Sequence, residues 1–195
     1  MSNLYTAIMA GAFTDCIYEI LKEPFRYDGW SLQGFGMLRL YLTKEIRMHI
    51  WHPHFAVPNV SLFHDHPWDF ESYIVCGALV NRRYQQGLGN THYCAKIQCG
   101  PGGCQKTPAE PCSLNLESEE IYIPGSTYKQ SADEIHVTEA QPGTVTIVER
   151  TFRPDTEHAR VFWKQPGNWV SAEPRAATNA EISAITIAAL KQLIS

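Results

Sequence analysis

Short runs of alternating apolar and polar residues fill the chain between Gly34 and Lys164, and they constrain its fold more than any other feature. Side chains on an extended strand point alternately to its two faces, so each run predicts a strand with one buried face. Glycine, proline and asparagine separate the runs. Many short strands punctuated by turn residues are typical of a sandwich or barrel. The predicted strands cover residues 37–42, 46–51, 73–80, 83–85, 91–97, 113–116, 120–123, 134–138, 144–152 and 161–164.

Helical periodicity is found at the two ends of the chain. Residues 4–21 carry apolar side chains on a roughly helical spacing, although Gly11 weakens the pattern. Thr178 and Glu181 form a capping-box pattern, and apolar residues follow at helical spacing. We therefore expect an all-β fold with a barrel core at about residues 34–164, an N-terminal helix at about 4–21 and a C-terminal helix at about 179–194. A chain of 195 residues has the size of one domain, so residues 1–195 are predicted to form a single domain.

Charge and hydropathy argue against several classes of partner. The formal net charge is −4 and lysines and arginines do not cluster, so no nucleic acid and no anionic membrane is expected as a partner. No apolar run is long enough to cross a bilayer. The first residues lack the basic segment of a secretory signal, and Asp15 and Glu19 interrupt the apolar stretch that follows. We expect a cytoplasmic protein.

His64-Asp65-His66 is the strongest functional signal. Two histidines at i and i+2 of an extended strand lie on the same face and can converge on one metal ion, whereas Asp65 must point the other way. Imidazole is the commonest protein ligand for borderline metals, and a functional site usually adds a third ligand from elsewhere in the chain. The best third candidate is His136, which enters a predicted strand after a proline–glycine turn. These three histidines predict a metal site.

The two histidine segments together resemble the motifs of the cupin superfamily. Its first motif has His-x-His, a glutamate three or four residues later and then a glycine; its second has Pro-x-Gly followed by a histidine. The matching residues are His64, His66 and Gly77 in the first motif, and Pro124, Gly125 and His136 in the second. The gap from glycine to histidine in the second motif is longer than usual. The resemblance covers roughly residues 34–164 and implies a cupin-type β-barrel, or jelly roll, that binds a divalent metal.

The chain departs from the cupin pattern at the glutamate. Counting back from Gly77, the position of the carboxylate ligand is occupied by Phe70, and Glu71 lies one residue away. In an unbroken strand Glu71 would face away from the metal, although a bulge could bring it back. We therefore expect a three-histidine site and keep Glu71 as a candidate fourth ligand.

Within the superfamily, the histidine pattern is most similar to the thiol dioxygenases, the cysteine dioxygenase group. That group uses three histidines, no carboxylate and the same His-Asp-His triplet, and it binds a substrate carboxylate with an arginine from an early strand. The resemblance implies an Fe(II)-dependent dioxygenase acting on a small thiol or carboxylic acid, with Arg39, or else Arg47, as the substrate-binding arginine. Both arginines could equally face solvent and cover the barrel exterior. The group's cysteine–tyrosine cross-link is missing, because Glu71 stands at the cysteine position.

Four aromatic residues are assigned to the surroundings of the metal. Tyr128 and Tyr73 are candidate hydrogen-bond donors beside it, and Trp68 and Phe70 are expected in the cavity wall or the core.

Two other functions fit the same residues. The first is a non-oxidative isomerase or lyase that uses zinc, nickel or manganese as a Lewis acid. The second is a cupin that binds a small molecule without catalysis. Folds of this kind support many different reactions, so the fold alone does not discriminate among the three functions.

The other histidines and cysteines are expected to be structural. We expect His49, His52 and His54 at the surface, beside a loop at residues 55–59. His52 and His54 could also chelate a metal by the same i, i+2 spacing, but Pro53 between them disfavours this alternative. Glu117, Glu119 and Glu120 are expected in a solvated acidic turn. Cys16 and Cys76 are predicted to be buried. The remaining cysteines are Cys94, Cys99, Cys104 and Cys112, and we predict that they are free thiols on a long hairpin. One alternative is a structural zinc site, which could include His92, and another is a disulfide. This insert could form a lid or a subunit contact, which leaves a homodimer open.

Overall fold

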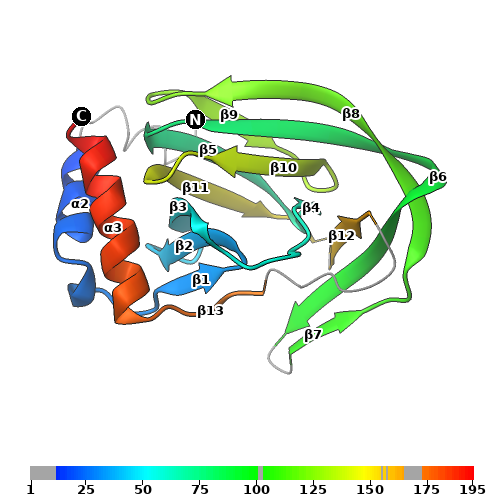
Figure 1. Ribbon diagram of the computed structural model, residues 1–195, viewed down its shortest axis with the longest axis horizontal. Coiled ribbons are helices and arrows are strands. Elements are labelled where there is room, and N and C mark those ends of the chain that lie inside the picture. The colour runs from blue at the N-terminus through cyan, green and yellow to red at the C-terminus, as the bar shows by residue number, and fades with distance from the viewer. Residues whose placement is uncertain (1–11, 101–102, 155, 157, 165–172) are drawn as a thin grey trace.

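The computed structural model describes residues 12–100, 103–154, 156, 158–164 and 173–195, without the side chains of residues 12, 13, 99, 100, 103 and 104. Two antiparallel sheets form the body of the protein, and two helices pack side by side at one end (Figure 1). The elements are α2 (Ala12–Lys22), η1 (Pro24–Arg26), β1 (Ser31–Gln33), β2 (Phe35–Tyr41), β3 (Ile46–Ala56), β4 (Phe63–His64), β5 (Trp68–Cys76), β6 (Leu79–Gly100), β7 (Gly103–Lys106), β8 (Glu110–Tyr122), β9 (Thr127–Gln130), β10 (Ile135–Ala140), β11 (Thr144–Phe152), β12 (Ala159–Trp163), β13 (Arg175–Ala176) and α3 (Asn179–Leu193).

The first sheet has seven strands in the order β13-β1-β2-β3-β11-β5-β9. Its two faces carry different side chains because alternate residues of each strand point to opposite sides. One face is apolar and packs against the helices, with Leu38, Met48 and Ile147 fully buried. The other face lines a cavity between the two sheets and carries Arg39, Arg47 and other polar residues. The period of two thus separates the core from the cavity within one sheet.

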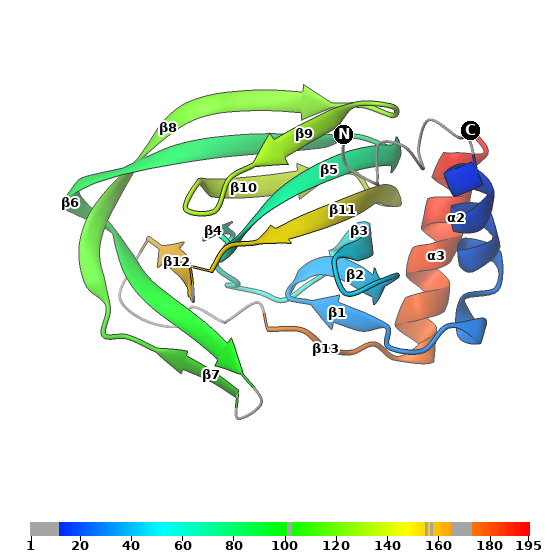
Figure 2. The same cartoon turned by 180° about the vertical axis from the view of Figure 1, so that it is seen from behind.

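The second sheet is nearly closed on itself. Its strands run in the order β10-β4-β12-β6-β7, and the early part of β6 also pairs with β10, which brings the first and fourth strands together. Strand β8 pairs along β6 and makes a long curved hairpin with it, opposite the helical end (Figures 1 and 2). The cavity lies between this sheet and the seven-stranded sheet, and residues of both sheets line it.

The two helices cover the outer face of the seven-stranded sheet. Ile17 and Leu21 of α2 and Ile185 and Ala189 of α3 belong to one buried cluster with the strand residues beneath them. Helix α3 begins with the predicted capping box, in which the Thr178 hydroxyl accepts the Glu181 N–H and the Glu181 carboxylate accepts the Thr178 N–H. No helix in the described part of the chain is both long and apolar enough to span a membrane.

Gly77 makes the turn from β5 into β6. Its φ angle is +74°, which disfavours any residue that carries a Cβ atom. A Cβ at this position would also collide with the Thr144 side chain, whose hydroxyl holds Ala78 through both its N–H and its carbonyl. The glycine of the first histidine motif therefore fixes the turn at the end of β5, the strand that follows His64 and His66.

The predicted β architecture with a helix at each end is confirmed, with several local corrections. The N-terminal helix is described from Ala12, and residues 4–11 lie outside the described part. Predicted runs 83–85 and 91–97 belong to one strand, β6, and runs 113–116 and 120–123 belong to β8. Predicted loop 55–59 is wrong at its start, because β3 continues to Ala56. The predicted acidic turn is also wrong: Glu117, Glu119 and Glu120 lie in β8, where Arg82 and Arg83 of β6 neutralise the last two.

Candidate metal centre

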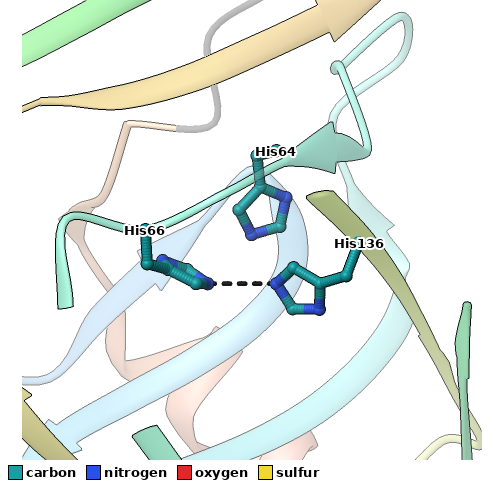
Figure 3. A group of neighbouring side chains, drawn as sticks. All are labelled: His64, His66 and His136. Atoms are coloured by element: carbon teal, nitrogen blue, oxygen red, sulfur yellow. Dashed lines mark hydrogen bonds between the residues drawn. The ribbon is translucent and has the colours of Figure 1, made fainter. Parts of the chain in front are cut away.

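His64, His66 and His136 come together as the sequence predicted. Strands β4 and β10 pair with His64 directly opposite His136, and His66 follows two residues after His64. One ring nitrogen from each histidine lies within 4.8 Å of the others, and Figure 3 shows the three rings turned toward one another. Among the described residues, this is the only group of three or more histidine, cysteine or acidic side chains that could hold a metal ion.

Hydrogen bonds orient two of the rings. The Nδ1 of His64 donates to the Leu62 carbonyl at 2.8 Å, since a carbonyl can only accept. The Nδ1 of His136 donates to the Asn81 Oδ1 at 2.9 Å. Both bonds leave Nε2 as the unprotonated nitrogen, which is the form that binds a metal.

The spacing of the nitrogens fits one shared ion. The Nε2 atoms of His66 and His136 are 3.1 Å apart. Two nitrogens that each lie 2.0–2.1 Å from a metal, at right angles to one another, are about 3 Å apart. Two facing lone pairs at this distance repel unless a proton or a cation lies between them. The donor set, and the spacing of His66 and His136 within it, therefore fit a divalent ion of the borderline class.

The surroundings keep the three imidazoles neutral. Burial lowers the pKa of His64, and it lowers the pKa values of His66 and His136 well below their ordinary value. The neighbouring histidines lower the pKa values of His66 and His136 further, and the positive charge of Arg47 opposes protonation of His64 and His66. A neutral imidazole is ready to bind a metal without first losing a proton.

We expect the metal-free protein to lose stability as the pH falls below about 6.5. The pKa of each site histidine is lower in the folded chain than in the unfolded chain, so the unfolded chain binds more protons in this range. The contribution of these histidines to the free energy of unfolding is complete above the pKa that they have in the unfolded chain. Below that pKa, the free energy of unfolding falls by about 1.4 kcal/mol per pH unit for each histidine that stays neutral in the folded chain. Urea unfolding across pH 5–8 measures the slope, which should be shallower in the His136→Ala variant. Equal slopes in the two proteins would contradict the prediction.

Asn81 was not predicted from the sequence, and it positions His136. Its side chain is fully buried on β6, where the amide Nδ2 donates to the Gln130 Oε1 at 3.1 Å. That bond fixes the Asn81 Oδ1 as the acceptor for the His136 ring, and the Thr138 hydroxyl donates to the same oxygen at 3.2 Å. No sequence signal points to this role, because Asn81 falls between the predicted strands 73–80 and 83–85 and asparagine is a residue type that strands disfavour.

The Asn81→Ala substitution is expected to weaken metal binding about 10- to 100-fold, because His136 loses the acceptor that fixes its ring. A calorimetric titration of metal into each protein measures the change in metal affinity. Asn81→Asp keeps an acceptor and should retain more affinity than Asn81→Ala. Asn115→Ala is a matched control, since Asn115 is exposed on the neighbouring strand β8. Equal affinities for Asn81→Ala and Asn115→Ala would rule out the positioning role.

Asp65 holds the segment that carries His64 and His66. It points away from the two rings, as the strand alternation predicted, and is 2 % exposed. Its carboxylate accepts the backbone N–H of Arg160 and pairs with the Arg160 guanidinium at 2.5 Å. The same guanidinium also donates to the Gln86 side chain and to the Asp133 carbonyl. Burial raises the pKa of Asp65, and the charge of Arg160 opposes that rise.

The three histidines line a cavity of about 360 Å³ between the two sheets. Trp68, Phe70 and Tyr128 also line it. The Phe70 ring lies 5.3 Å from the His66 ring and 5.9 Å from the His136 ring, measured between centroids. The apolar ring of Phe70 thus lies beside the histidines, at the position that the glutamate ligand has in the cupin motif. Burial raises the pKa of Tyr128, so its hydroxyl stays protonated and can donate.

Glu71 and Tyr73 lie on the opposite face of β5 from Phe70. The register between β5 and β11 is regular from Trp68 to Ile74, so the bulge that Glu71 would need does not occur there. The Glu71 carboxylate lies 4.0 Å from the Lys129 ammonium, and neither Glu71 nor Tyr73 lines the cavity. The structure therefore gives these two residues no direct contact with the three histidines.

Arg39 and Arg47 both line the cavity. The prediction of a surface position for His49 is wrong: it is 6 % exposed, lines the cavity, and its Nε2 has no hydrogen-bond partner. Burial and then Arg47 lower the pKa of His49 well below its ordinary value. His54 is exposed and His52 half-buried.

The cysteines form no metal site within the described residues. Cys94 and Cys112 are free thiols, which agrees with the prediction, and Cys76 is buried as predicted. Cys16 is exposed, which contradicts its predicted burial. Strands β6 and β7 bring the backbones of Cys99 and Cys104 opposite each other, and their side chains lie outside the described part.

Comparison of the chain with protein-family models and with curated proteins gives no match. The functional argument therefore depends on the geometry of the three histidines and of the cavity.

Proposed function

We propose that the protein is a cupin-type metalloenzyme that holds a divalent ion through His64, His66 and His136, with Fe(II) as the favoured metal. The observation that carries this proposal is the convergence of three neutral imidazoles on one wall of the cavity between the two sheets. Three protein ligands leave coordination positions open, as in catalytic rather than structural metal sites. We further propose that the reaction is a dioxygenation of a small thiol or carboxylic acid.

His64, His66 and His136 would hold the iron ion, which would supply open positions for a substrate and for dioxygen. The chain's own residues supply the rest of the site. Trp68 and Phe70 form an apolar wall that excludes water, and Tyr128 offers a hydroxyl donor in the same cavity. Arg39 or Arg47 orients an acidic group of the substrate, since a guanidinium binds a carboxylate through two parallel hydrogen bonds.

Oxygen consumption tests the proposal. The purified protein is loaded with Fe(II) under anaerobic conditions, its metal content is confirmed by elemental analysis, and oxygen uptake is followed with a panel of small thiols and carboxylic acids. We expect uptake with at least one substrate, and none with the His136→Ala variant. Full iron occupancy without uptake on any substrate would overturn the dioxygenase. Turnover of the same compounds by zinc-loaded protein without oxygen would replace it with Lewis-acid chemistry.

A further inference from the structure

Three arginines gather around one tyrosine on the cavity face of the seven-stranded sheet. Arg39 on β2, Arg47 on β3 and Arg150 on β11 place their guanidinium carbons 5.1, 6.0 and 5.2 Å from the centre of the Tyr41 ring. Arg47 and Arg150 also lie 5.2 Å from the Trp68 ring. Three like charges are thus held together by aromatic rings, whose faces attract cations.

The cluster lacks a negative partner among the described residues. The protein has nine arginines. Six of them form ion pairs with acidic side chains: Arg26, Arg82, Arg83, Arg153, Arg160 and Arg175. The three arginines without an acidic partner are the three that surround Tyr41. Since the chain neutralises its other arginines, this concentration of unpaired charge requires an explanation.

Burial makes the unpaired charge costly. Arg47 is 5 % exposed, and its Nε has no hydrogen-bond partner; Arg150 is 8 % exposed, and its Nε has none either. Burial and then the charge of Arg150 lower the pKa of Arg47. A buried charge without a counter-charge is destabilising, so such groups are retained where a ligand supplies the missing charge.

No acidic side chain that lines the cavity is paired with these arginines among the described residues. Of its acidic lining residues, Asp65 is already bound to Arg160, and Glu173 is exposed and forms no ion pair among the described residues. Arg39 and Arg47 line the cavity that the three histidines also line. Arg39 keeps free donors, because its one hydrogen bond runs from Nε to the Ser31 hydroxyl at 3.2 Å. A ligand in the cavity can therefore meet guanidinium donors and the histidines at the same time.

We propose that Arg39 and Arg47, which line the cavity, bind a doubly negative group of the ligand with the neighbouring positive charge of Arg150 in support, and that this group is either a phosphate monoester or two neighbouring carboxylates. One arginine is enough to bind a single carboxylate, whereas three match a group that carries two charges. The link to the metal rests on the proposed function, but the anion site itself does not. A substrate bound here would carry a dianionic end and present its other end to the apolar and histidine-lined part of the cavity.

Calorimetry on the metal-free protein tests this proposal with inorganic phosphate, malonate and acetate at equal ionic strength. We expect phosphate or malonate to bind at least tenfold more tightly than acetate, and the better of the two identifies the dianion. Arg39→Gln and Arg47→Met should each weaken that binding at least tenfold. Arg82→Met is the matched control, because it removes an arginine that is paired with Glu119 and Glu139 outside the cavity.

Two results would overturn the anion site: acetate binding as tightly as both dianions, or dianion affinity unchanged in the variants. Arg39 is half-buried, so Arg39→Gln remains informative if Arg47→Met fails to fold. Metal affinity should stay at the level of the unaltered protein in Arg39→Gln. Failure of anion binding with oxygen uptake intact would overturn this inference alone, and the reverse result would overturn the proposed function alone.

Discussion

Replacing His136 with alanine is expected to lower metal affinity by more than about 100-fold. Loss of an outer partner of a ligand costs 10- to 100-fold, and loss of the ligand itself must cost more. A metal that binds only the folded state stabilises it by about 2.7 kcal/mol at a concentration 100 times its Kd. The unaltered protein should show this gain in unfolding experiments, and His136→Ala should show almost none at the same metal concentration.

His92→Ala is the control for this experiment. His92 is a buried histidine on β6, in the same sheet as His136, and it is not part of the three-histidine group. It should keep the full metal-dependent gain in stability. The metal-free His136→Ala protein should remain folded, because the substitution removes one of three imidazoles that crowd together without a shared cation. If metal protected His136→Ala as well as it protects His92→Ala, the site would not be the one described.

The Asp65→Ala substitution is expected to destabilise the protein by about 3 kcal/mol, because removal of one partner from a buried ion pair leaves the other uncompensated. The cost lies at the low end for such pairs, since the Arg160 side chain is 25 % exposed and keeps two other acceptors. Metal affinity should fall as well, because the carboxylate holds the segment between His64 and His66. Urea unfolding and metal titration measure the two effects.

Asp69→Ala provides the comparison. Asp69 pairs with Arg153 at 2.8 Å, but both side chains are about one-third exposed, so its loss should cost about 1 kcal/mol. Asp65→Asn keeps an oxygen that can accept the Arg160 N–H and should fall between the two. Similar losses of stability in Asp65→Ala and Asp69→Ala would show that the buried Asp65–Arg160 pair contributes no more to stability than the more exposed Asp69–Arg153 pair.

The three-histidine group was the part of this protein that the sequence predicted best. The i, i+2 spacing of His64 and His66 predicts that they share one face of a strand. His136 could be chosen as the third ligand because it enters a predicted strand after a proline–glycine turn. The structure adds the reason that they meet, which is the register that sets His64 opposite His136. The absence of a carboxylate ligand also followed from the spacing, since alternation places Phe70 and not Glu71 toward the histidines.

Other features depended on neighbours that are distant in sequence. His49 lies in a run with Met48 and Ile50 that reads as a strand, but nothing local shows that both faces of that strand are enclosed. Cys16 lies on the exposed face of α2, although the apolar residues around it in the sequence predicted burial. Asn81 could not be recognised as a partner of His136, because the two residues meet only through the pairing of β6 with β10.

The sequence by itself determined the local features: alternating strands, the Thr178–Glu181 cap, the turn at Gly77 and the shared face of His64 and His66. Each of these depends on backbone geometry and on residues within a few positions of one another. Only the tertiary structure decided which faces became core and which became cavity, and it alone brought Arg39, Arg47 and Arg150 together. Periodicity specifies that two faces differ, but pairing between distant strands determines what each face meets.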